Sequence, residues 1–345
     1  MINQYLLKKQ IDLGNSIRNC KKIYLDINFW IGLRDQEKDS DKELFNILEK
    51  LVDENKCVLP ISEILFWEML KQSDVNSLKK MANVMTRLSK GYSVIGDQER
   101  QQLEFINFIH SKTQKPVFDL NVAAWTKTSI NIIYNMMLKF EPEKADNRFI
   151  DFLENISFEK IITLAESGNF KPFRFKDDIE YQNKAKEKYK HENKSFKQMY
   201  LSELSGYLEA FDSDFIRYMD DIYFLETGMH LSSIEKENVH FANWSLCIYN
   251  LVRVNKITTE LPSFTIFSEL YASVRWNKDR KYKDGNDTLD FMHATAALPY
   301  FDYFFTEKEL RNNIEQLKLD ERYNCKVLSN TNDIIKELQL ICLKK

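Results

Sequence analysis

The sequence predicts a three-layer α/β/α protein, in which a mostly parallel central sheet is accompanied by a mainly helical insertion. Short apolar runs alternate with helix-like segments near both ends of the chain, as in the βαβ units of a parallel sheet. From 98 to 262 the spacing of apolar residues is almost wholly helical, without a clear strand. Only 8 Gly and 6 Pro in 345 residues also indicate a largely helical chain.

The first strand is expected in the segment KKIYLDINF, where only Asp26 interrupts the apolar run 23–27. A short run with polar flanks favours a strand that is buried on both faces. Ser62 stands before the apolar segment EILFWEM, where it is placed to cap a helix. The other elements expected in this part are helices at 5–18, 41–55, 63–69 and 74–89, and strands at 57–61 and 92–95.

The alternation of strands and helices returns after residue 262. The pattern predicts helices at 263–275, 287–299 and 307–318, and strands at 303–306 and 325–328. We therefore expect residues 1–97 and 263–345 to form one discontinuous domain, and residues 98–262 to form the helical insertion.

Charge and cysteine content leave several function classes open. The chain has 49 basic and 52 acidic residues, and a net charge of −3 does not exclude nucleic acid, because a basic face can form locally. Five cysteines without a CxxC pair favour a reducing compartment over a zinc site or a disulfide framework. The first residues are too polar for a signal peptide, and no apolar run approaches the ~18 residues of a membrane span. We expect a cytoplasmic protein without a membrane partner.

Asp26 is the first candidate for a functional acid. It is expected at the carboxyl end of the first strand, with Asn28 two residues later, and ligands of open α/β sheets bind beyond these strand ends. An ionised Asp in an apolar run is also costly to bury without a partner. The alternative is that Asp26 only caps the following helix, which is the more frequent role of an Asp in this position.

Two further acids lie in separate segments. Glu68 belongs to a very apolar helix, where a glutamate is costly unless it meets a cation. Glu63 competes with it, but Glu63 lies in the first helical turn, where the helix dipole alone explains an acid. Glu307 follows the strand 303–306, and taken alone it is a charged residue that opens a helix.

The segment NDTLDFMHATAALPY carries Asp287, Asp290 and His293 at intervals of three residues, so they lie on one stripe of a helix. The two acids repel each other unless a cation lies between or above them. The alternative is that Asp287 caps the helix, that Asp290 is favoured by the dipole, and that His293 is a core histidine. Together with Asp26, Glu68 and Glu307, these acids form an oxygen-rich set of the kind that Mg²⁺ or Mn²⁺ prefers.

The motifs YLDIN, ISEILFWE, D-x-x-D-x-x-H-A-x-A-A-L and YFFTEKEL, in this order, resemble the successive motifs of PIN-like domains. The resemblance covers roughly 20–95 and 263–330. It implies a metal-dependent endoribonuclease that cuts single-stranded RNA. The site carboxylates that it implicates are Asp26, Glu68, Asp290 and Glu307.

The resemblance also assigns the surrounding residues. Asp287 is an added acid, as in variants with the ND-x-x-D-x-x-H form, while Asn28, Thr306 and His293 would be outer partners of the acids. The family usually has Asp at the fourth position, so Glu307 departs from its pattern. An antitoxin or regulatory protein partner is implied by family analogy alone. The oligomeric state is not predicted.

The segment RWNKDRKYKDGN precedes the acidic helix and interleaves basic with aromatic residues. Its cations would bind RNA phosphates, and Trp276 or Tyr282 would stack on a base. A solvated loop is an equally good interpretation. The basic residues concerned are Arg275, Lys278, Arg280, Lys281 and Lys283.

Two other functions remain as alternatives. A phosphatase of the haloacid dehalogenase type also has an Asp after its first strand, but it needs DxD, and here Asn28 replaces the second Asp. The other alternative is a catalytically inactive PIN-like module that binds RNA or a protein. The presence of all the acids named above counts against the inactive module.

Overall fold

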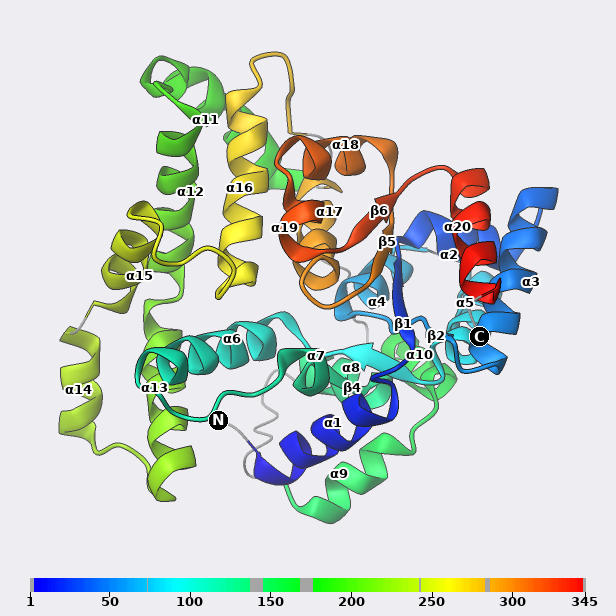
Figure 1. The fold of residues 1–345 in the computed structure, drawn as a ribbon, viewed down its shortest axis with the longest axis horizontal. Helices are drawn as coiled ribbons and strands as arrows, with labels where there is room; N and C mark the ends of the chain where they lie inside the picture. The colour runs from blue at the N-terminus through cyan, green and yellow to red at the C-terminus, as the bar shows by residue number, and fades with distance from the viewer. Residues whose placement is uncertain are drawn as a thin grey trace. The chain divides into compact units, whose positions relative to one another are not determined.

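The computed structural model describes residues 3–72, 74–136, 145–167, 176–241, 243–282 and 286–343. The protein is a mixed α/β protein with a small parallel sheet and many helices (Figure 1). Its chain divides into two compact units. The sheet unit comprises Gln4–Gly96, Leu120–Phe173 and Ala296–Lys345, and the helical unit comprises Met1–Asn3, Asp97–Asp119 and Arg174–Thr295.

The core of the sheet unit is a parallel sheet with the strand order β2–β1–β5–β6 (Figure 1). The strands are β1 (Lys21–Leu25), β2 (Cys57–Val58), β5 (Tyr303–Phe305) and β6 (Lys326–Leu328). Leu25 pairs with Phe305, and Phe305 pairs with Leu328. The apolar residues of β1 and β5 are buried, as expected for strands that are covered on both faces. These strands confirm the predicted parallel sheet.

Helices pack around this sheet because each presents an apolar stripe. In α3, Leu44, Leu48 and Leu51 recur at helical spacing and are all buried, and α20 packs along this helix (Figure 1). The first group of helices is α1 (Gln4–Ser16), α2 (Ile27–Asp35), α3 (Asp39–Asp53), α4 (Glu63–Met69) and α5 (Val75–Ser89). The last group is α18 (Lys308–Gln316), α19 (Leu319–Tyr323) and α20 (Thr331–Leu343).

A second, two-stranded sheet corrects two expectations. The strand expected at 92–95 exists as β3 (Tyr92–Val94), but it pairs antiparallel with β4 (Trp125–Lys127) instead of joining the parallel sheet. One parallel bridge, between Ile61 and Ser93, connects β3 to the residues after β2. The expectation that 98–262 lacks a strand is therefore wrong. A strand of three residues is too short to show a clear alternation in the sequence.

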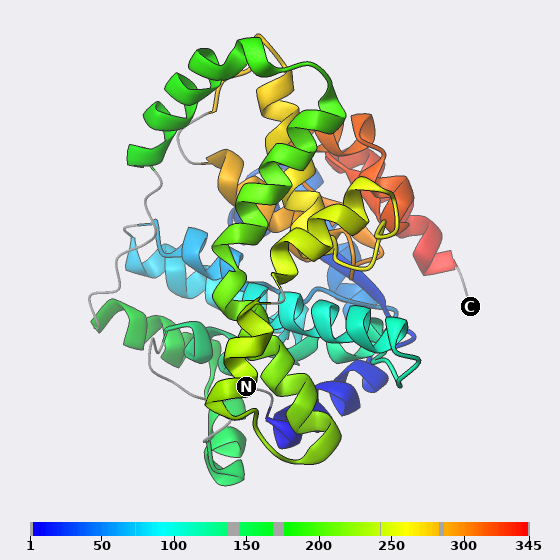
Figure 2. The same cartoon turned by 90° about the vertical axis from the view of Figure 1, so that its left-hand side faces the viewer.

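The helical unit is organised around α12 and α16, which pack along each other (Figure 2). Its core contains Phe105, Phe215 and Phe264, whose rings lie with centroids 5.1 and 5.8 Å apart in successive pairs. The helices are α6 (Asp97–Lys112), α11 (Lys176–Tyr189), α12 (Phe196–Ala210), α13 (Asp212–Thr227), α14 (Ser233–Phe241), α15 (Trp244–Arg253), α16 (Pro262–Trp276) and α17 (Asn286–Ala297), with a 3₁₀ turn η2 (Lys190–Glu192).

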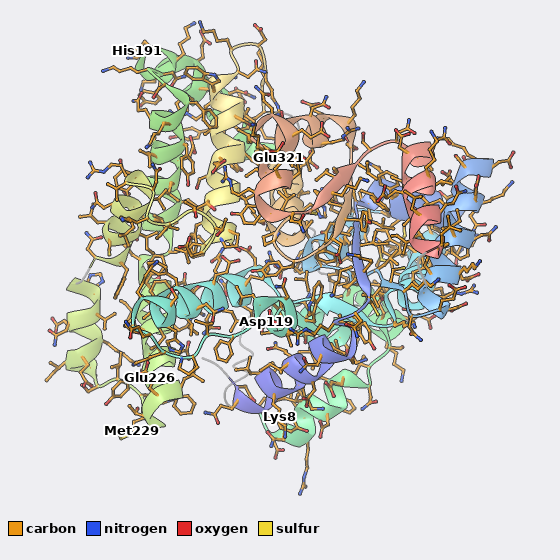
Figure 3. All side chains as sticks on the ribbon, viewed as in Figure 1. Lys8, Asp119, His191, Glu226, Met229 and Glu321 are labelled. Atoms are coloured by element: carbon orange, nitrogen blue, oxygen red, sulfur yellow. The ribbon has the colours of Figure 1, made fainter. Side chains whose placement is uncertain are left out.

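Polar contacts also hold the helical unit together. Buried Glu104 on α6 accepts hydrogen bonds from the backbone nitrogen of Ser263, at 3.0 Å, and from its hydroxyl, at 2.8 Å. Glu226, labelled near the end of α13 in Figure 3, forms an ion pair with Lys115 at 2.5 Å. The first contact satisfies amino-terminal donors of α16, which would otherwise lack partners.

The boundaries of the two units differ from the domain boundaries expected from the sequence. Residues 120–173 belong to the sheet unit, because β4 pairs with β3 and because α8 (Thr128–Met136) and α10 (Phe158–Ser167) pack on α4 and α5. The short helices α7 (Leu120–Ala123) and α9 (Asn147–Glu154) complete this segment. Residues 263–295 belong to the helical unit, because α16 packs along α12. None of the described helices is both long and apolar enough to cross a membrane.

Candidate metal site at the strand ends

An acid stands at the carboxyl end of each of two neighbouring strands. Asp26 follows β1, and Glu307 follows Thr306 at the end of β5. Leu25 and Phe305 are paired, and the backbone nitrogen of Asp26 donates to the carbonyl oxygen of Phe305 at 3.0 Å. Asp26 and Thr306 therefore lie side by side at the same edge of the sheet. The predicted position of Asp26 at this strand end is confirmed.

Hydrogen bonds connect these residues. The hydroxyl of Thr306 donates to Asp26 Oδ2 at 2.9 Å, and the backbone nitrogen of Asn28 donates to Asp26 Oδ1 at 3.4 Å. The side-chain amide of Asn28 donates to the carboxylate of Glu307. Asp26 thus caps α2, as its alternative interpretation predicted. The cap uses only part of the hydrogen-bonding capacity of the Asp26 carboxylate, because a carboxylate has about four acceptor positions.

The helix that carries Glu68 is fixed to β1 through Ser62. The Ser62 hydroxyl lies 2.6 Å from the hydroxyl of Tyr24 in β1, and it accepts a hydrogen bond from the backbone nitrogen of Leu65 at 3.3 Å. The predicted cap of α4 is confirmed. Glu68 is partly exposed on this helix, whereas Glu63 in the first turn is buried.

The negative charge of Glu307 is unfavourable in the absence of a cation. Burial raises the pKa of Glu307, and the carboxylates of Asp26, Glu309 and Glu68 raise it further by repulsion. The hydrogen bond from Asn28 opposes this change because it favours the charged form. Asp26 and Glu68 therefore each act electrostatically on Glu307, and a divalent cation would relieve this repulsion.

These donors suit a hard divalent cation. Among the described residues, no three His, Cys, Asp or Glu side chains are already arranged as a metal-binding group. Mg²⁺ commonly takes only one or two carboxylates from a protein and keeps several waters. Asp26 and Glu307 fit this kind of site, because both offer carboxylate oxygens and follow adjacent strand ends. Glu68 acts electrostatically on Glu307.

The other predicted acids, Asp287 and Asp290, lie on α17. The residues of this helix up to Thr295 belong to the helical unit. Asp287, Asp290 and His293 share this helix, as expected from their spacing. The helix begins at Asn286, so Asp287 lies in its first turn and is not the residue before it. Arg280 donates to Asp287 Oδ1 at 2.6 Å, and both side chains are nearly buried. The assignment of Asp287, Asp290 and His293 to the metal site stays a prediction.

Two of the cations predicted to bind RNA are already paired. The guanidinium of Arg275 bonds to Glu203, and that of Arg280 bonds to Asp287. Lys278 and Lys281 are exposed, while Lys283 lies outside the described residues. Tyr282 is buried, so stacking on a base is left to Trp276, which is 44% exposed.

Helix α11 holds this basic segment in a way that the sequence did not reveal. Lys186 donates to the carbonyl oxygens of Asn277, at 2.5 Å, and of Arg280. The side chain of Asn183 accepts from the backbone nitrogen of Tyr282 at 2.9 Å and donates to its carbonyl oxygen at 3.0 Å. Roughly a hundred positions separate these partners, and no local pattern predicts such a contact.

The chain matches no protein-family model, no curated protein and no solved structure. The function proposed below accordingly depends on the side chains around Asp26 and on their contacts.

Proposed function

We propose that this protein is a divalent-metal-dependent nuclease with a PIN-like three-layer fold, which hydrolyses phosphodiester bonds of single-stranded RNA. The observation that carries the proposal is the pair of acids at adjacent parallel strand ends. Asp26 and Glu307 are far apart in the sequence, but Thr306 and Asn28 join them through hydrogen bonds. The order of the acidic motifs along the chain supports the same function.

In this proposal Asp26, Glu307 and Glu68 hold Mg²⁺ or Mn²⁺. When bound, the ion supplies an activated water and stabilises the charge that develops on the phosphate. Thr306 orients Asp26, and Asn28 orients Glu307. Carboxylates alone would repel a polyanion, and a bound divalent ion would reduce the negative charge that the substrate meets.

The expected roles of Asp290 as a ligand and of His293 as an outer partner remain predictions from the resemblance. A ligand role for Asp287 requires its ion pair with Arg280 to open. The proposal also includes a cytoplasmic location and an antitoxin or regulatory protein as a partner.

The direct test is cleavage of end-labelled single-stranded RNA in Mn²⁺, with and without EDTA, by the wild type and by Asp26→Asn. We expect the variant to lose more than about a hundredfold in rate, which exceeds the usual effect of changing an outer partner of a metal ligand. Asn retains the size of Asp26 and caps helices well, so the fold should be kept.

Asp35→Asn is a matched control on the same helix, because Asp35 is exposed and forms an ion pair with Arg34. This variant should cut as fast as the wild type. Full cleavage by Asp26→Asn would rule out the site. A wild type that binds RNA without cutting it in Mn²⁺ would instead identify the inactive binding module.

A further inference from the structure

Side chains of α11 bind the backbone that connects α16 to α17 in the helical unit. We call residues 277–282 the strap. Lys186 Nζ donates to two carbonyl oxygens within its first four residues, and the side-chain amide of Asn183 exchanges two hydrogen bonds with the backbone of Tyr282, at 2.9 and 3.0 Å. Asn183 and Lys186 lie on one face of α11, because residues at this spacing are neighbours on a helix surface. This face therefore holds the strap at both ends.

These polar contacts matter for α11 because its described part has no buried side. None of the side chains of residues 179–189 is buried, and Tyr181 is 75% exposed. A helix without an apolar stripe gains little from packing, and segments with few buried contacts open locally more often than a core does. Hydrogen bonds such as those of Asn183 and Lys186 therefore hold α11 in its docked position, and the loss of either residue should weaken its docking.

The docked strap presents positive charge to the solvent. Lys278 and Lys281 are exposed. The carbonyl oxygens of Asn277 and Arg280, whose partial negative charge would repel a phosphate, are instead bound by Lys186. A strap that is already ordered also loses less conformational entropy when a ligand binds. The docked form of the strap is therefore the better one for binding a polyanion.

The charge of Lys186 is disfavoured in the docked position. Burial lowers the pKa of Lys186 and the guanidinium of Arg280 lowers it further, whereas the carboxylates of Asp279 and Glu187 oppose this change. A phosphate close to the strap would stabilise the ammonium group, because an opposite charge favours the charged form. The binding of a polyanion and the docking of α11 should therefore support each other.

We propose that Asn183 and Lys186 are positioning residues, which dock α11 on the strap and thereby present Lys278 and Lys281 to the phosphates of single-stranded RNA. This role rests on the proposed function, which supplies RNA as the ligand, but neither the metal site nor cleavage takes part in it. A coupling between two binding equilibria is reciprocal. RNA that binds the strap more tightly when α11 is docked must therefore also stabilise the docked α11.

The test measures the affinity of the full chain for a fluorescently labelled oligouridylate in EDTA, at several salt concentrations. Lys186→Met removes two hydrogen bonds of the docked helix and should weaken binding about tenfold. The matched variant Lys184→Met removes the same charge from the same helix, where Lys184 is exposed and pairs with Glu180, and should change the affinity little. Asn183→Ala leaves the net charge unchanged, so it should weaken binding without altering the slope of log K against log salt.

Hydrogen exchange gives a second measurement that does not depend on the folding of any variant. In the wild type, the backbone amides of α11 and of the strap should exchange more slowly when the oligouridylate is added. Unchanged exchange in both segments on saturation with RNA would overturn the proposal. Tighter binding by Asn183→Ala or Lys186→Met would also overturn it, because α11 would then cover the strap and not present it. A slope reduced by about 0.7 for Lys186→Met alone would show that Lys186 contacts a phosphate directly.

Failure of the nuclease proposal gives a different result. A wild type that binds RNA and shows the slower exchange, but does not cut RNA in Mn²⁺, would refute the nuclease activity and leave the positioning role supported. A wild type that cuts RNA, with equal affinities for Asn183→Ala, Lys186→Met and the unchanged chain, would refute only the positioning role. A wild type that does not bind the oligouridylate in EDTA would overturn the positioning role whatever the cleavage assay shows.

Discussion

At Glu307 a carboxylate is held where burial and neighbouring acids disfavour its charge. Its pKa in the folded chain is raised, so the unfolded chain loses this proton first as the pH rises. The charged side chain therefore lowers the stability of the metal-free protein at neutral pH. Below about pH 4 both states are largely protonated, and this effect disappears.

We therefore predict that Glu307→Gln increases the free energy of unfolding in EDTA at pH 7 and changes it little at pH 3.5. Urea unfolding at both pH values measures this difference. Glu315→Gln is the control, since Glu315 on α18 forms an exposed ion pair with Arg311. The same gain at both pH values would contradict the charge effect. With saturating Mn²⁺ the sign should reverse, because the variant then lacks a ligand.

A second prediction concerns the hydrogen bond from the Thr306 hydroxyl to Asp26. Its buried hydroxyl donates to Asp26, so Thr306→Val leaves a buried carboxylate oxygen without this donor. The expected cost is about 1–3 kcal/mol of unfolding free energy. Thr306→Ser keeps the hydroxyl and loses one methyl group, which costs about 0.8 kcal/mol. Chemical denaturation of both variants checks the order, and a Thr306→Val variant as stable as the wild type would show that the hydrogen bond contributes nothing.

Elements with a self-contained apolar pattern could be predicted from the sequence. The stripe of α3 and the cap at Ser62 before α4 depend on residues within a few positions of one another. The three residues of β4 carry no such pattern, and the antiparallel partner of β3 lies about thirty residues away. Such pairing is determined by tertiary contacts, so it was not predicted.

The candidate site could likewise be predicted only in part from the sequence. The neighbouring positions of Asp26 and Glu307 follow from two short apolar strands and from the rule that parallel strands end at one edge. The ion pair between Arg280 and Asp287 joins residues that had been assigned separate roles. Such a pairing depends on the path of the chain between them, which no spacing rule gives.

The next prediction concerns which residues of the basic segment before α17 contact RNA. Since Arg275 and Arg280 are paired with acids, Lys278 and Lys281 are the residues expected to contact phosphates. Lys278→Ala with Lys281→Ala should weaken RNA binding and flatten the plot of log K against log salt by about 0.7 for each lysine. Affinity measured in EDTA at several salt concentrations gives this slope.

The matched control replaces one lysine of α11 and one of the following 3₁₀ turn η2, both of which already pair with acids. Lys184 pairs with Glu180, and Lys190 pairs with Glu187, so Lys184→Ala with Lys190→Ala should change the slope less. An unchanged slope for the Lys278 and Lys281 variant would show that this segment is only solvated. Equal changes for both variants would indicate a diffuse effect of net charge.

On the scale of the whole molecule, each unit has an apolar core of its own. In the sheet unit, Phe304 is fully buried and its ring lies 5.4 Å from that of Tyr24 in β1. In the helical unit, Phe264 is fully buried between the rings of Phe211 and Phe215, at 5.6 and 5.8 Å. A compact unit with its own core can in principle unfold by itself. The chain nevertheless passes between the units several times, so its order does not reveal this independence.

We predict that cavities in the two cores act locally. Phe304→Ala and Phe264→Ala should each cost about 3–5 kcal/mol, since each removes a large buried ring. Hydrogen exchange followed by mass spectrometry should then show faster exchange in β1, β5 and β6 for Phe304→Ala, with α12 and α16 unchanged. Phe264→Ala should give the reverse. Faster exchange throughout both units in either variant would mean that the chain unfolds as one cooperative body, and that changes made in the helical unit would also destabilise the strand ends that carry Asp26 and Glu307.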